Sequence, residues 1–97
     1  MYSVDRLRGC VLGECAGDAL GFPVEGQPPA VCADHVARVV LGTERPAEAG
    51  WGLAFGQYTD DSQLMRELVQ SFVARGGFEA ADYAKRIAAI FAEARIV

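Results

Sequence analysis

Four glycines recur at every fourth position near the start of the chain, at Gly9, Gly13, Gly17 and Gly21. On an α-helix, residues four apart fall on nearly the same face, so this spacing predicts a stripe of backbone without side chains. Each interior glycine costs a helix about 1 kcal/mol relative to alanine. A repeated cost of that size indicates a backbone that closely approaches a neighbour. The neighbour is either another helix that crosses at short range or a ligand near the end of the stripe.

The remainder of the chain also has the spacing of helices. Alanine and glycine are the commonest residues, and the excess of alanine favours helices over a sheet. Hydrophobic residues make up 52% of the 97, so the chain should pack a core. Apolar positions predict helices over 3–20, 30–40, 60–74 and 80–94. Residues 41–58 are glycine-rich and read as a long loop without a strand. The positions expected in the core are Val31, Val36, Val39, Leu64, Met65, Leu68, Val69, Phe72, Val73, Tyr83, Ile87, Ile90 and Phe91.

Charge and hydropathy exclude several classes of partner. Nine Lys and Arg against 13 Asp and Glu give a net charge of -4, a sign that disfavours nucleic acid and anionic bilayers. No apolar run approaches the roughly 20 residues that cross a bilayer, and charged residues interrupt the region where a secretory signal would lie. We therefore expect a cytoplasmic protein, with no nucleic-acid or membrane partner and with its three cysteines as reduced thiols.

Three cysteines and one histidine raise the question of a zinc site. Cys32 and His35 are three residues apart and could share a metal. Cys10 and Cys15, however, are five apart on a predicted helix and therefore point away from each other. We interpret the thiols as small hydrophobic groups rather than as zinc ligands, and we place His35 on a polar turn.

The segment with the most chemistry reads Tyr-Thr-Asp-Asp-Ser-Gln from Tyr58 onward. Thr59 or Asp60 is placed to cap the third helix, with Gln63 three residues after Asp60 as in a capping box. One hydroxyl and two adjacent carboxylates also offer the hard oxygen ligands that Mg²⁺, Mn²⁺ or Ca²⁺ prefers. A helix cap can also hold a metal, so both interpretations of Thr59, Asp60 and Asp61 stay open.

Two motifs occur in order: Gly-Asp-Ala-Leu-Gly-Phe-Pro-Val-Glu over 17–25 and Gly-Gln-Tyr-Thr-Asp-Asp-Ser-Gln over 56–63. Together they resemble the amino-terminal part of the ADP-ribosylglycohydrolase family, which includes the dinitrogenase-reductase-activating glycohydrolase. Residues 78–97 resemble the family's next helix, so the resemblance covers nearly the whole chain. Ser62 departs slightly from the motif, because the family most often has Thr there.

The resemblance implies an orthogonal all-α fold, of which this chain is the amino-terminal portion as a single domain. It implies hydrolysis of the glycosidic bond that joins ADP-ribose to a protein side chain, with two Mg²⁺ (or Mn²⁺) ions as cofactors. The implied partner is an ADP-ribosylated protein or an ADP-ribose-like small molecule. By motif position, Thr59, Asp60 and Asp61 are metal ligands, and Asp60 also contacts substrate. Glu25 falls on an acidic residue that binds substrate and acts in catalysis.

The implied chemistry agrees with these residue types. Cleavage at the ribose anomeric carbon passes through an oxocarbenium-like state, where a carboxylate can activate water or stabilise positive charge. The chain ends before the family's later Asp-rich motif, so we expect the 97 residues alone to be inactive. Two alternatives stay open: an inactive fragment that serves as a helical binding or interaction module, and an unrelated helical domain whose acidic turn is only a cap.

Overall fold

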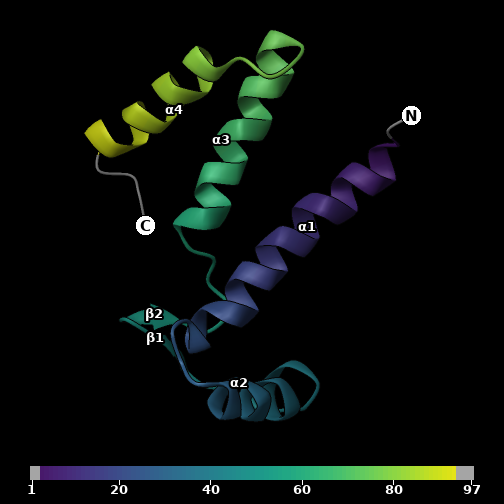
Figure 1. Cartoon of the computed structure of the whole chain (residues 1–97), viewed down its shortest axis with the longest axis vertical. Helices are drawn as coiled ribbons and strands as arrows, with labels where there is room; N and C mark the ends of the chain where they lie inside the picture. The colour runs from purple at the N-terminus through teal and green to yellow at the C-terminus, as the bar shows by residue number, and fades with distance from the viewer. Residues whose placement is uncertain (1–2, 94–97) are drawn as a thin grey trace. The chain divides into compact units, whose positions relative to one another are not determined.

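The chain is all-α apart from one minute hairpin of strands. A computed structural model describes residues 3–93, and the elements follow one another as α1, η1, α2, η2, β1, β2, α3 and α4 (Figure 1). The chain divides into two compact units, Met1–Tyr58 and Thr59–Val97. Within residues 3–93, no helix combines the length and the hydropathy that a bilayer crossing requires. The expected all-α class is confirmed.

In the first unit, α1 spans Val4–Gly21 and begins after a side-chain cap at Ser3. The hydroxyl oxygen of Ser3 accepts a hydrogen bond from the backbone N–H of Arg6 at 3.1 Å, and Asp5 lies in the first turn. The glycine stripe is present along this helix. Within the described part of its own unit, and apart from the helix's own backbone, no atom lies within 4 Å of the Cβ position that a side chain at Gly9, Gly13, Gly17 or Gly21 would occupy. The close neighbour that the stripe predicts, a crossing helix or a ligand, stays a prediction.

The helix expected over 30–40 is divided in the structure. After the short helix η1 (Phe22–Val24), an α-helix α2 spans Pro29–His35 and continues as a π-helical turn, η2, over Val36–Val40. The N–H of Leu41 closes this turn on the carbonyl of Val36 at 2.8 Å. Gly42 follows, and a Cβ there would overlap the carbonyl oxygen of Arg38. The wide turn therefore brings the backbone at position 42 so close to the Arg38 carbonyl that only glycine fits there.

Burial along this segment also differs from expectation. Val39 is buried as predicted, but Val31 and Val36 are exposed. Val31 lies in α2 before the π turn and Val36 is the first residue of that turn, so the buried side of this segment is narrower than the regular spacing of valines predicts.

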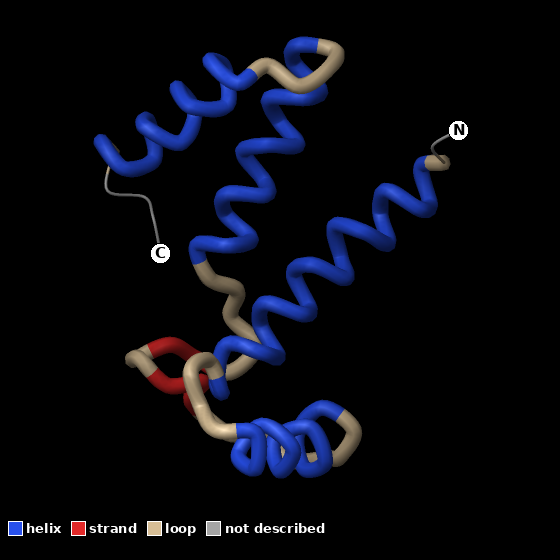
Figure 2. Tube along the Cα trace, viewed as in Figure 1, coloured by secondary structure: helices blue, strands red, loops and turns tan. Residues whose placement is uncertain are grey.

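The expectation of no strand was wrong for part of the segment 41–58. Strand β1 (Glu48–Gly50) pairs antiparallel with β2 (Leu53–Ala54), which Figure 2 shows in red. The reversal runs through three consecutive positive φ angles, 97° at Gly50, 55° at Trp51 and 75° at Gly52. Glycine adopts such angles at little cost, so the Gly-Trp-Gly sequence permits the tight hairpin. Strands of three and two residues are too short to show alternation.

The second unit is a helical hairpin. Helix α3 spans Asp60–Arg75 and α4 spans Ala80–Ala92, close to the predicted 60–74 and 80–94. Gly76 ends α3 in the left-handed region with φ 72°, which is the usual place for glycine after a helix. Ile90 on α4 is only 2% exposed. Residues 94–97, including the Arg95-Ile96-Val97 part of the family resemblance, lie outside the described residues.

Several residues expected in the core of this hairpin are exposed. Phe72, Val73 and Phe91 are each at least half exposed. Within the unit, α4 is the helix that packs on α3, so the hairpin itself covers only one face of each helix. The buried positions are instead largely polar, namely Ser62, Glu67, Ser71 and Asp82.

Candidate functional site

The Thr-Asp-Asp motif forms the start of α3. Thr59 is the N-cap, in extended conformation, and its hydroxyl oxygen accepts a hydrogen bond from the N–H of Asp61 at 3.3 Å. The N–H of Gln63 donates to the carbonyl oxygen of Thr59, also at 3.3 Å, and begins the helical ladder. The predicted cap is confirmed, and Thr59 rather than Asp60 provides it.

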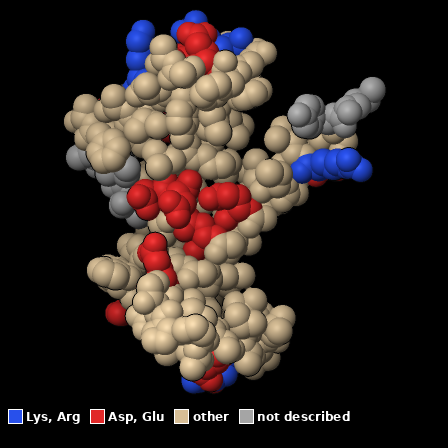
Figure 3. Space-filling model, viewed as in Figure 1, with Lys and Arg blue, Asp and Glu red and all other residues tan. Residues whose placement is uncertain are grey.

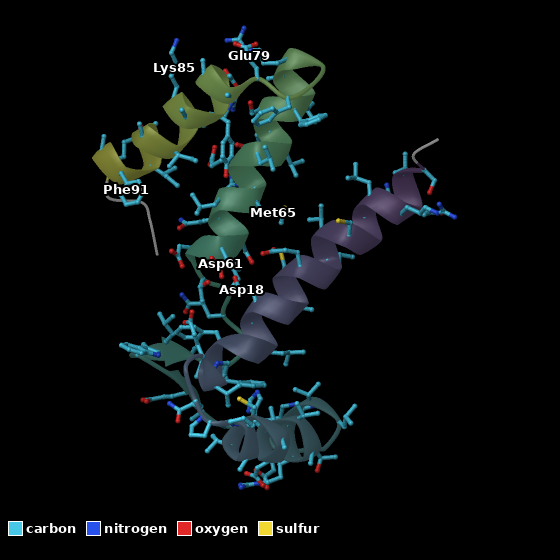
Figure 4. The ribbon with its side chains drawn as sticks, in the orientation of Figure 1. Asp18, Asp61, Met65, Glu79, Lys85 and Phe91 are labelled. Carbon is cyan, nitrogen blue, oxygen red and sulfur yellow. The ribbon has the colours of Figure 1, made fainter. Side chains whose placement is uncertain are left out.

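Burial separates the three motif residues. Thr59 is 7% exposed, whereas the side chains of Asp60 and Asp61 are open to solvent. Both carboxylates lie in the first helical turn, where the partial positive charge of the helix N-terminus favours them. Figure 4 labels Asp61 at this end of α3 and Glu79 beyond the other end. Consecutive helical residues point about 100° apart, so the two carboxylates suit two neighbouring ions better than joint chelation of one.

The donor set fits part of a magnesium or manganese site. Hydroxyl and carboxylate oxygens are the correct ligand types, but Mg²⁺ takes about six ligands and the motif supplies three side chains. Between residues 3 and 93, no three or more His, Cys, Asp or Glu side chains are grouped so that they could hold a metal ion. A metal site at Thr59, Asp60 and Asp61 would therefore need further ligands, and the role of these three residues as ligands stays a prediction.

Glu25 lies in the other unit, at the corner of a tight turn. The N–H of Gln27 donates to the carbonyl of Val24 at 3.0 Å, with Glu25 and Gly26 at the two central positions. Glu25 has φ −56° and ψ 128°, and Gly26 has φ 74°. These angles match a type II turn, whose third residue needs a positive φ and is therefore usually glycine. The sequence Val-Glu-Gly-Gln thus holds Glu25 at an exposed corner.

The structure gives His35 and Cys32 contacts that the sequence did not indicate. His35 lies in α2, within the helix predicted over 30–40, and its Nε2 is 2.7 Å from the carbonyl oxygen of Leu20 at the end of α1. The Cys32 thiol lies against carbonyls of the Glu25 turn and is only partly buried, so it is not a purely hydrophobic group. Cys32 and His35 are three residues apart, which places both side chains on one face of α2. That spacing was the one sequence signal for these contacts.

A buried acid between α3 and α4 was missed by the sequence analysis. Asp82 accepts hydrogen bonds from the hydroxyl of Ser71 at 2.6 Å, from Nε of Arg86 at 2.8 Å and from Nε of Arg75 at 3.1 Å. The Ser71 hydroxyl, followed by the Arg86 guanidinium, holds the pKa of Asp82 well below its ordinary value. Figure 3 shows basic and acidic side chains together where α3 meets α4.

These contacts give Asp82 a structural role. Its carboxylate joins the two helices of the hairpin, because Ser71 and Arg75 belong to α3 and Arg86 to α4. The sequence held one signal for this cluster, two pairs of residues spaced four apart: Ser71 with Arg75, and Asp82 with Arg86. They indicate which side chains share a helix face, but not that the two faces meet.

Comparison with known proteins agrees with the motifs. The family model described as ADP-ribosylglycohydrolase matches residues 2–95. The chain is 35% identical over 88 residues to the ADP-ribosylhydrolase ARH3 of Gallus gallus, with 86% of this chain and 24% of the relative covered. It is 34% identical over 89 residues to ARH3 of Mus musculus, with 89% of this chain and 24% of the relative covered.

A bacterial relative is similar at the same level. The ADP-ribosylarginine hydrolase Tri1 of Pseudomonas putida is 33% identical over 85 residues, with 88% of this chain and 21% of the relative covered. The chain therefore spans about a quarter of the length of the curated relatives it matches. No solved structure matches it.

Proposed function

The chain belongs to the ADP-ribosylglycohydrolase family, and on that premise we propose that it supplies the amino-terminal part of the active site of an ADP-ribosyl hydrolase. The reaction is hydrolysis of the glycosidic bond between ADP-ribose and a modified protein side chain. The observation that carries the proposal is the Thr-Asp-Asp motif at the start of α3, with Thr59 as a buried cap and two exposed carboxylates beside it.

In this proposal, Thr59, Asp60 and Asp61 hold one side of a site for two Mg²⁺ or Mn²⁺ ions. When bound, these ions orient ribose hydroxyl groups and stabilise negative charge near the scissile bond. The cap contributes directly to this geometry, because the Thr59 hydroxyl fixes the Asp61 amide and with it the direction in which the first turn presents its carboxylates. Asp60 is open to solvent and also contacts a ribose hydroxyl.

Glu25 acts on the attacking water. Its carboxylate is exposed at the corner of a turn, where it can accept a proton from water as the bond from the anomeric carbon to the side chain breaks. The water oxygen forms the new bond to that carbon, and the departing side-chain group receives the electron pair and a proton. The same carboxylate can stabilise the positive charge on the ribose ring before attack.

The metal proposal can be tested on the chain itself with Mn²⁺ as a paramagnetic probe. In amide NMR spectra we expect low Mn²⁺ to broaden the signals of residues 59–62 selectively and excess Mg²⁺ to restore them. The double variant Asp60→Asn, Asp61→Asn should abolish this effect. Glu79→Gln, which removes an exposed carboxylate beyond the opposite end of α3, is the matched control and should leave the effect unchanged. If Mn²⁺ broadens the signals of residues 59–62 equally in the wild type and in the double variant, Asp60 and Asp61 are not metal ligands and the segment serves only as a helix cap.

A further inference from the structure

The turn that carries Glu25 is contacted by a side chain of α2. The Cys32 sulfur lies 3.9 Å from the carbonyl oxygen of Val24 and 3.6 Å from that of Gln27, the first and last residues of the turn. His35 is one helical turn further along the same face and contacts the Leu20 carbonyl, just before the chain leaves α1 for η1. All of these residues belong to one compact unit.

The contact from His35 is the stronger of the two. A carbonyl oxygen only accepts hydrogen bonds, so at 2.7 Å the Nε2 atom of His35 must carry the proton and donate it to Leu20. Leu20 lies in the last turn of α1, where carbonyl groups lack donors from their own helix. His35 supplies that missing donor from a different helix. It therefore ties the end of α1 to α2, a few residues before the Glu25 turn.

Cys32 adds a weaker contact at the turn itself. A thiol is a weak donor and has one hydrogen, which serves either the Val24 or the Gln27 carbonyl at a given moment. The Val24 carbonyl already accepts the hydrogen bond from the Gln27 amide that closes the turn. Cys32 thus adds to a turn that the Gln27–Val24 hydrogen bond already closes. Of the two side chains, His35 is the one that contacts the end of α1.

We propose that His35, assisted by Cys32, is a positioning residue for Glu25. The inference rests on the proposed function, because it assigns His35 the task of holding a carboxylate that acts on water. Glu25 lies at an exposed corner, so the placement of its carboxylate depends on the backbone before and after it. An error of about 1 Å in the position of a reacting group can cost about 100-fold in rate, so an anchor on each side of that corner serves the reaction.

Amide hydrogen exchange on the 97-residue chain tests the anchor. Replacing His35 with leucine keeps bulk but removes the donor, and we expect the Glu25 and Gln27 amides to exchange about 10-fold faster, the effect of losing one hydrogen bond. His35→Gln retains an N–H donor and should recover most of the protection. Asp34→Asn, an exposed neighbour on α2, is the matched control and should change nothing. Cys32→Ala should accelerate exchange about twofold.

Two results would overturn the anchor. One is unchanged exchange at Glu25 and Gln27 in His35→Leu. The other is a wild-type chain in which these amides exchange as fast as in an unstructured peptide. General loss of structure is recognised from the α3 and α4 amides, which lie in the other unit and should keep their protection in every variant. If His35→Leu also accelerates exchange in α3 and α4, that variant has lost its general structure and His35→Gln is used in its place. A His35→Gln variant whose Glu25 and Gln27 amides exchange faster than those of Cys32→Ala then overturns the proposal.

A titration with ADP-ribose and Mg²⁺, followed at the Glu25 amide, separates this inference from the proposed function. We expect the wild-type Glu25 signal to shift and the apparent affinity to fall about 5-fold to 10-fold in His35→Leu. A wild-type Glu25 signal that does not respond contradicts the proposed function, even if the exchange results hold. A response that is identical in wild type and His35→Leu contradicts the positioning role alone.

Discussion

Thr59→Ala, compared with Thr59→Ser, tests whether the cap of α3 holds the turn that presents Asp60 and Asp61. Thr59 is 7% exposed and its hydroxyl accepts the Asp61 amide. Alanine removes both the hydroxyl and the methyl group. Serine removes only the methyl group and keeps the hydroxyl, so the difference between the two variants measures the loss of the hydroxyl, including its capping hydrogen bond to the Asp61 amide.

The expected magnitude follows from the two groups lost. Replacing a capping residue with alanine costs about 0.5–2 kcal/mol, and the 3.3 Å contact lies at the long end of hydrogen bonding, so about 0.5–1 kcal/mol is expected here. A buried methyl group adds up to about 0.8 kcal/mol. Thr59→Ala should therefore destabilise the chain by about 0.5–1.8 kcal/mol. With about 4–8 °C per kcal/mol in a small domain, its melting temperature should fall by roughly 2–14 °C.

Thermal unfolding followed by circular dichroism measures the loss, and exchange of the Asp61 amide locates it. Thr59→Ser should melt within about 5 °C of the wild type, because serine is an equally good cap. With millimolar Mg²⁺, the wild type and Thr59→Ser should both gain stability through ion binding, whereas Thr59→Ala should gain less. A Thr59→Ala variant that melts with the wild type, or a serine variant that loses as much as alanine, would refute the reasoning.

Three further predictions follow from the contacts of both units. The Ser71 hydroxyl, followed by Arg86, lowers the pKa of Asp82 below its ordinary 3.8. The stabilising effect of the ionised Asp82 is therefore complete above about pH 4 and is lost as the pH falls further. The difference in melting temperature between wild type and Asp82→Asn should be constant from pH 7 to about 5 and shrink below about 4. Gly26→Ala forces a side chain into φ 74° and should speed exchange of the Gln27 amide about fivefold or more, while leaving α3 unchanged. The purified 97-residue chain with excess Mg²⁺ should release no ADP-ribose from a modified protein in repeated turnovers, because Thr59, Asp60 and Asp61 supply only part of a metal site; chelator-sensitive turnover would contradict this.

Local signals in the sequence determined the helices that carry the motifs. Ser3 and Thr59 are side-chain acceptors at helix starts, and both cap a helix in the structure. Gly76 ends α3 in the left-handed conformation that glycine adopts most readily. Such signals work because a cap or a stop depends on hydrogen bonds and backbone angles within a few residues. For the same reason, the sequence identified the Thr-Asp-Asp turn, whose three residues lie together on one end of α3.

Burial was predicted less well, because it depends on which helix covers which face. Regular spacing placed Phe72 and Phe91 in a core, but within their hairpin each helix has one partner and both side chains are exposed. In the second predicted helix, likewise, Val39 is buried, whereas Val31 and Val36 are exposed. Hydrophobic periodicity identifies an apolar face, and only the packed structure decides whether anything covers it.

The sequence by itself determined that the chain is helical, where α1, α3 and α4 begin, and which acidic residues the family motifs contain. The tertiary structure alone decided that Asp82 joins two helices and that His35 reaches the end of α1 from 15 residues away. Both contacts join residues separated by 11 or more positions, and each needs two helix faces to meet at a particular register. Spacing along a chain defines each face separately, whereas the meeting of the faces depends on the loops and turns between them.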